Sequence, residues 1–159
     1  MVAFLREIGL AVRFGPVSAK TVNPGLTIER GVLVIDESRL RYPGDLLHEA
    51  GHLAILTPEA RSAAGGNVGR GGEELAAIAW SYAATLHLAI DPSVVFHPGG
   101  YRGGGAAIVE GYASGSTMGV PLLEWFEMCD RRGGDKAFPQ MRHWLNPTAR
   151  AVAPEIART

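Results

Sequence analysis

Short apolar runs separated by turn residues occupy the N-terminal part of the chain, a pattern typical of a small β-sheet. Residues 26–30 and 32–35 are rich in β-favouring side chains and are separated by a single glycine. An Asn-Pro-Gly turn signal precedes them. Residues 2–9 are predicted to form a short helix, and residues 11–17 a strand that breaks at Pro16. We therefore predict a small N-terminal sheet.

Longer apolar runs with helical spacing follow the predicted sheet. One helix is predicted over residues 46–56, with Asp45 as its N-cap and a Thr-Pro pair as its stop. A second helix is predicted over residues 73–90, where an Asp-Pro pair ends it. Three shorter helices are predicted over residues 106–113, 121–130 and 138–145. A small sheet followed by helices predicts an α+β fold.

Two glycine-rich stretches, residues 65–72 and 97–105, follow the two longer predicted helices. Neither contains the Gly-Lys-Ser/Thr ending of a phosphate loop, and neither has the strand–GxGxxG–helix context of a dinucleotide site. We interpret both stretches as surface loops or as the rim of a site.

The length of the chain, 159 residues, suits one domain with a substantial core. We predict a single domain over residues 1–147 and a tail over residues 148–159, which is too poor in apolar residues to fold alone. Apolar residues make up 47% and charged residues 19%, as in globular proteins. A formal net charge of −1, with both signs mixed along the chain, indicates neither a nucleic-acid nor an anionic-membrane partner. Nothing in the composition indicates an oligomeric state.

Cysteine content and hydropathy bear on the compartment of the protein. The single cysteine, Cys129, excludes an intrachain disulfide and is interpreted as a buried small apolar residue. The longest apolar stretch, residues 75–90, is interrupted by polar side chains and predicts a buried helix, not a membrane span. Residues 1–10 lack the cleavage pattern of a signal peptide. We therefore expect a cytoplasmic location.

The motif that carries chemistry is HExxH, formed by His48-Glu49-Ala50-Gly51-His52. On a helix, this spacing places both imidazoles on one face, one turn apart, so that they can share a metal ion. Glu49 then lies where it can accept a proton from a water that attacks a carbonyl. Nitrogen ligands and a tetrahedral site with an open position favour zinc. The motif predicts His48 and His52 as zinc ligands and Glu49 as the general base.

A catalytic zinc site needs a third protein ligand. The candidates are a glutamate from the next predicted helix, His87 and His97. Glu73 and Glu74 begin that helix, and its alanines would let it pack closely on the motif helix. Acidic residues in a first helical turn are also favoured by the helix dipole alone. We expect one of the pair to ligate and the other to cap or to orient a histidine. We favour Glu74 as the ligand and keep Glu73 as the alternative.

HExxH followed by a glutamate on the next helix, in an E-x-x-A setting, resembles the gluzincin branch of the zincin metallopeptidases. The resemblance covers residues 26 to about 88, and it extends to the compact peptidase domains of some bacterial regulatory systems. It implies a zincin-like fold in which a small sheet packs on the motif helix. It also implies a zinc cofactor held by His48, His52 and Glu74, with Glu49 as the base and a peptide or protein as the substrate.

A peptidase also needs a hydrogen-bond donor for the developing oxyanion, usually a Tyr or His opposite the base. His97 and Tyr101 lie on the second glycine-rich stretch, from which they could approach the metal. We therefore include both as candidate catalytic residues. Tyr82 and His87 lie on the predicted Glu-bearing helix and are interpreted as core or as support for the ligands.

The sequence favours a zinc-dependent hydrolase, and among hydrolases a metallopeptidase. The alternative is a non-catalytic binding or regulatory domain of zincin fold with a structural or vestigial zinc site. A weaker third option is a metal-free helical domain in which the motif is accidental.

Overall fold

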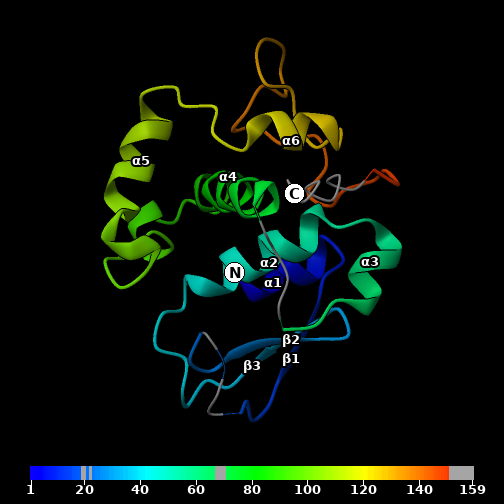
Figure 1. Cartoon of the computed structure of the whole chain (residues 1–159), viewed down its shortest axis with the longest axis vertical. Helices are drawn as coiled ribbons and strands as arrows, with labels where there is room; N and C mark the ends of the chain where they lie inside the picture. The colour runs from blue at the N-terminus through cyan, green and yellow to red at the C-terminus, as the bar shows by residue number, and fades with distance from the viewer. Residues whose placement is uncertain (19–20, 22, 67–70, 151–159) are drawn as a thin grey trace, which may run out of the picture.

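The computed structural model describes residues 1–18, 21, 23–66 and 71–150. These residues form a mixed α+β structure with a three-stranded sheet and several helices, as predicted. The sheet lies on one side, and helices α2, α4 and α6 are stacked above it in that order (Figure 1). Predictions for residues 67–70 of the first glycine-rich stretch and for residues 151–159 of the tail fall outside the described residues.

The sheet contains β1 (Ala11–Phe14), β2 (Leu26–Glu29) and β3 (Val32–Ile35) in the order β1-β3-β2. The central strand β3 runs parallel to β1 and antiparallel to β2. Arg30 and Gly31 form the two-residue turn between β2 and β3, and their φ angles of 49° and 76° are both positive. Such a turn matches the twist of the strands it joins. The three predicted strands are confirmed.

The helices begin and end as follows: α1 (Val2–Glu7), α2 (Asp45–Ile55), α3 (Pro58–Ala63), α4 (Gly72–His87), α5 (Gly105–Ala113) and α6 (Val120–Trp125), with short 3-10 turns η1 (Pro92–Val94) and η2 (Tyr101–Gly103). Helix α4 is central. Every residue from 76 to 85 is buried, so the middle of the helix is enclosed on all sides. In the described part of the chain, no helix combines the length and apolar character needed to cross a membrane.

Two details near the motif helix correct the sequence predictions. The N-cap of α2 is Gly44, and Asp45 is the first residue of the helix. Its carboxylate is engaged by a ring nitrogen of His97 and makes no cap hydrogen bond. The Thr-Pro pair ends α2 but also starts α3, because the Thr57 hydroxyl accepts a hydrogen bond from the backbone N–H of Ala60. This helix was not predicted.

The C-terminal helical predictions are only partly right. Helix α4 ends at His87 and not at residue 90, because Ala89 has a φ of 52°. Helix α6 ends at Trp125 and not at residue 130, because Glu127, two residues beyond its end, has a φ of 60°. The helix predicted over residues 138–145 is wrong: that segment consists of turns and bends. The apolar residues of this segment are spaced as in a helix, but side chains such as Trp144 pack on the core from a loop.

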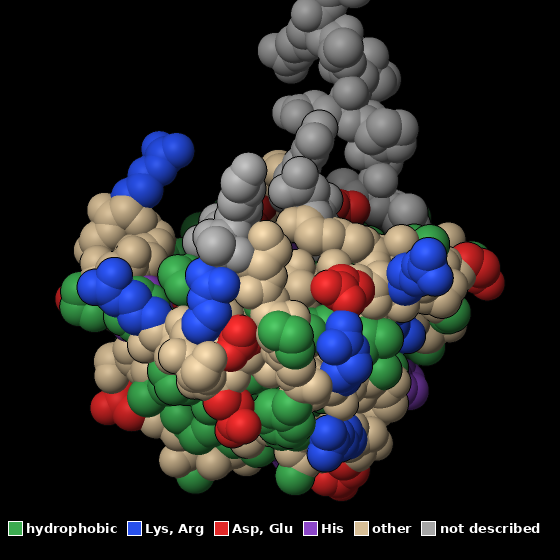
Figure 2. Space-filling model, turned by 90° about the horizontal axis from the view of Figure 1, so that it is seen from below, with side chains coloured by type: hydrophobic (Ala, Val, Ile, Leu, Met, Phe, Trp, Pro, Cys, Tyr) green, Lys and Arg blue, Asp and Glu red, His purple; other side chains and the backbone are tan. Residues whose placement is uncertain are grey.

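The surface beneath the sheet carries acidic and basic side chains interspersed with apolar ones, without a large patch of one sign (Figure 2). This mixture agrees with the near balance of charge along the sequence. Cys129 is buried and only 1% exposed, as predicted.

Candidate metal centre

Helix α2 brings the two motif histidines together. The Nε2 atoms of His48 and His52 lie 3.0 Å apart, and their rings are nearly perpendicular, with an interplanar angle of 86°. The side chain of His52 is 4% exposed and that of His48 is 15% exposed. Both imidazoles therefore aim the same ring atom at one point from successive turns of the helix.

Glu74, in the first turn of α4, completes the group. Its Oε1 atom lies 3.4 Å from His48 Nε2, and its Oε2 atom lies 3.2 Å from His52 Nε2. The buried alanines of α4 let the two helices approach closely, as the sequence suggested. The Glu74 side chain is 43% exposed, so the group is reached from solvent on this side.

These distances fit a tetrahedral metal ion. Zinc–nitrogen and zinc–oxygen bonds of about 2.0–2.2 Å place neighbouring tetrahedral ligands about 3.3–3.6 Å apart. The Nε2–Nε2 separation of 3.0 Å and the two Glu74 contacts, 3.4 Å from Oε1 to His48 and 3.2 Å from Oε2 to His52, lie within about 0.3 Å of that range. The two Glu74 contacts use different oxygens of the carboxylate. The residues present thus suit a divalent ion held by two imidazole nitrogens and one carboxylate.

The electrostatics of the group also suit a cation. Burial lowers the pKa of His48 to about 4, helped by the charge of His52 and opposed by Glu74. The hydrogen bond to His52 holds the pKa of Glu74 below its usual value. At neutral pH the set therefore offers an unprotonated His48 lone pair and an ionised carboxylate, which are the forms that bind metals.

Glu49 lies beside the ligands, with one carboxylate oxygen already engaged. The side-chain amide of Asn23 donates a hydrogen bond of 2.6 Å to Glu49 Oε1. Burial, more than any neighbouring charge, raises the pKa of Glu49. A carboxylate with a raised pKa, held in one orientation, is suited to accepting a proton near neutral pH.

Tyr101 contacts the far side of the His48 ring. Its hydroxyl oxygen lies 3.1 Å from His48 Nδ1. When Nε2 binds a metal ion, Nδ1 would carry the ring proton and could donate it to the phenol oxygen. Burial and then the nearby Asp45 carboxylate raise the pKa of Tyr101, so the phenol stays protonated. Tyr101 and Arg102 both have positive φ angles, 51° and 54°, a strained conformation that the contacts of the ring with His48 and Phe96 help to maintain.

His97 lies in a separate contact. Its Nε2 atom lies 2.8 Å from Asp45 Oδ1, and its ring stacks on Tyr42 with centroids 3.8 Å apart. Its Nδ1 atom and that of His52 are buried without a hydrogen-bond partner among the described residues. His97 is buried against the start of α2 and does not belong to the ligand group.

The structure thus separates the candidates proposed from the sequence. It brings His48, His52 and Glu74 together, with Glu49 beside them. It places the Tyr101 hydroxyl against His48 and His97 against the Asp45 carboxylate. The oxyanion role expected of both residues stays a prediction. Two other third-ligand candidates, His87 at the far end of α4 and Glu73, lie outside the ligand group.

Sequence reasoning missed the roles of two residues: Asn23 contacts Glu49, and the charge of Asp45 raises the pKa values of Glu49 and Tyr101. Asn23 precedes Glu49 by 26 positions and lies in a turn, so no local signal connects the two. Asp45 lies three residues before His48, a spacing that shares a helical face, and this spacing could have identified it.

Comparison of the chain with protein-family models, with characterised proteins and with solved structures finds no match.

Proposed function

We propose that this chain is a zinc-dependent hydrolase of zincin-like fold, acting on amide bonds in peptides or proteins. The observation that carries the proposal is the convergence of His48, His52 and Glu74, whose side chains contact one another at 3.0–3.4 Å beside Glu49. The order of sheet, HExxH helix and glutamate-bearing helix supports the zincin-like assignment.

Each residue of the centre has a distinct task in this proposal. A zinc ion bound by the three ligands supplies a Lewis acid that polarises a carbonyl and lowers the pKa of water. Glu49 accepts the proton of the attacking water and later delivers it to the leaving amine. Asn23 fixes one Glu49 oxygen, which leaves the other oxygen for the proton. Tyr101 keeps the His48 ring oriented with Nε2 toward the ion.

Substitution of Glu49 by Gln tests the catalytic part of the proposal. Gln keeps the size of the side chain and can still contact Asn23, but it cannot accept the proton. We expect zinc binding close to one equivalent and a loss of peptide hydrolysis of about 10²–10⁴-fold. Elemental analysis and cleavage of a mixed peptide pool provide the two measurements. Unchanged turnover in Glu49→Gln would refute Glu49 as the base.

A second function, a non-catalytic zinc-binding domain, is favoured by the contacts of Tyr101 and His97. Both side chains already have polar partners within the chain, His48 and Asp45. In that case wild-type protein binds zinc at one equivalent, chelation lowers its melting temperature, and no peptide in the pool is cleaved. If the wild-type protein cleaves peptides, and this cleavage is lost both on chelation and in Glu49→Gln, the result supports the hydrolase and excludes the non-catalytic domain.

A further inference from the structure

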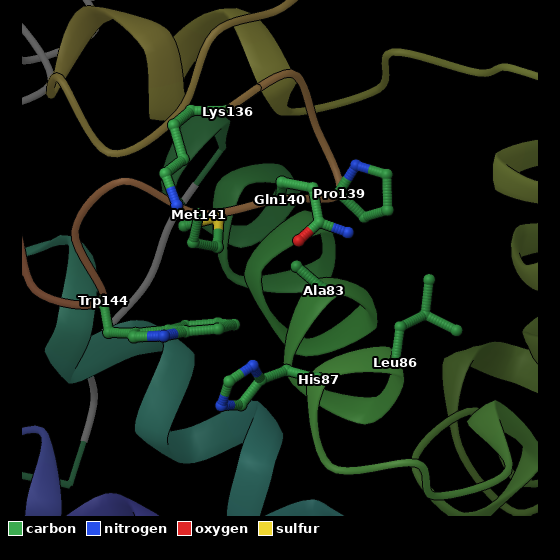
Figure 3. Close-up of a pocket in the computed structure, with 8 residues that line it drawn as sticks. All are labelled: Ala83, Leu86, His87, Lys136, Pro139, Gln140, Met141 and Trp144. Carbon is green, nitrogen blue, oxygen red and sulfur yellow. The ribbon is translucent and has the colours of Figure 1, made fainter. Parts of the chain in front are cut away.

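A pocket of about 510 Å³ lies at the opposite end of α4 from the metal ligands. It is lined by the last turns of α4 and by residues 136–144 of the segment that follows α6 (Figure 3). Its volume is in the range of small-molecule sites. His87 in this pocket follows Glu74 by thirteen positions, about 20 Å along the helix, so the two sites are separate.

The walls of the pocket are fixed by contacts with the core. Trp144 packs edge-on against Phe4 and Trp80, at centroid distances of 5.0 and 5.6 Å. Its backbone carbonyl accepts a 2.9 Å hydrogen bond from the indole N–H of Trp80. The backbone N–H of Arg142 donates to the carbonyl of Met128 at 2.8 Å. The pocket is therefore formed before any ligand arrives, which lowers the entropic cost of binding.

The polar side chains of the lining favour an anion. Lys136, Gln140 and His87 face the pocket, and no Asp or Glu of the described residues lines it. Asp130, an acid close by in the same segment, is held by the Arg142 guanidinium through two hydrogen bonds of 2.7 and 2.8 Å. Within the described lining, the Lys136 ammonium is therefore the group that carries a full charge, and it has no acidic partner there.

The aromatic part of the lining favours a ligand with a flat, apolar ring. The rings of Trp144 and His87 lie 5.0 Å apart at an interplanar angle of 55°. Figure 3 shows these two rings on one side of the pocket and Lys136 with Gln140 across from them. A planar ligand can thus contact the aromatic side with its ring while its charged end reaches the ammonium and the amide.

We propose that this pocket binds a small aromatic carboxylate, with its ring against Trp144 and its carboxylate at Lys136. The site is independent of the metal centre and of the hydrolase proposal. The ligand class follows from the pairing of one unopposed cation with an aromatic wall in a preformed pocket.

Titration with benzoate, followed by two-dimensional NMR of the backbone and indole N–H groups, tests the proposal. We expect saturable shifts centred on Trp144, His87 and Met141. Benzyl alcohol, which keeps the ring without the charge, and acetate, which keeps the charge without the ring, should each bind about tenfold or more weakly.

The exposed Lys136 permits a charge-removing variant that leaves the fold intact. Lys136→Met should weaken benzoate binding about tenfold or more. Arg132→Met removes the same charge from the same segment outside the lining, and should leave the affinity unchanged. The proposal is overturned by absence of saturation below about 10 mM, by equal affinity in Lys136→Met, or by shifts centred on His48 instead of Trp144.

Discussion

Gly51 in α2 lies directly against the backbone of Ala77 in α4. A β-carbon at position 51 would lie 2.9 Å from the carbonyl oxygen and 3.3 Å from the α-carbon of Ala77. The Ser81 hydroxyl, which donates to the Ala77 carbonyl at 2.6 Å, also lies at this crossing. Because Gly51 lies between Glu49 and His52, the motif itself sets the helix separation that brings Glu74 to the histidines.

Substitution of Gly51 by Ala should push the two helices apart. Because the obstacle is backbone and cannot rotate away, we expect the free energy of unfolding to fall by about 1–3 kcal/mol, less the gain in helix propensity of up to about 1 kcal/mol. Zinc affinity should fall as well, since Glu74 moves away from His48 and His52. Denaturant unfolding and competition with a chelating dye measure the two effects.

Gly65→Ala is the matched control for this change, because a β-carbon at position 65 would meet no atom within 4 Å. Its stability and zinc affinity should equal those of the wild type. Wild-type zinc affinity in Gly51→Ala would show that the crossing does not set the position of Glu74.

The sequence predicted best where the signal is local. The turn between β2 and β3, the helix that carries His48 and the helix that begins near Glu74 all follow from spacing and turn residues. The choice of Glu74 over Glu73 was close on the sequence alone, and in the structure Glu74 is the one that joins the group with His48 and His52.

The sequence predicted least where contacts join distant segments. The bond from Asn23 to Glu49 and the contact of Tyr101 with His48 span 26 and 53 positions. Periodicity carries no information about either contact. The segment around Trp144 has helix-like spacing, yet it is a loop because its apolar side chains are fixed by tertiary packing on Phe4 and Trp80.

The two adjacent glutamates at the start of α4 give a sharp test of ligand identity. Outer-shell changes typically lower metal affinity by about 10–100-fold. Glu74→Gln removes a ligand itself and should lower zinc affinity by more than about 100-fold. Glu73→Gln removes the same charge one position away and should stay close to wild type. Isothermal titration with zinc compares them. The reverse order of affinities would assign the third ligand to Glu73.

Cys129 should be inert in the folded protein. Burial, followed by the charges of Asp130 and Glu124, raises its pKa from 9.0 to about 12. The reactive thiolate fraction at pH 8 is therefore about a thousandfold lower than in the unfolded chain, and alkylation should slow accordingly. Above pH 9 the unfolded chain releases this proton first, so stability falls as the pH rises. Iodoacetamide labelling with and without denaturant measures the ratio, and equal rates would contradict the burial of the thiol.

Tyr101 provides the test that separates orientation of a ligand from catalysis. Tyr101→Phe keeps the ring, which lies 5.6 Å from His48 and 5.1 Å from Phe96, and removes only the hydroxyl that His48 Nδ1 contacts at 3.1 Å. If the hydroxyl orients His48, zinc affinity should fall by about 10–100-fold. Tyr112→Phe removes a buried hydroxyl that donates to Met118 instead, and should leave zinc affinity unchanged. If Tyr101 instead acts on the substrate, Tyr101→Phe binds zinc normally and loses turnover at saturating metal, which would return this residue to the oxyanion role that the sequence suggested.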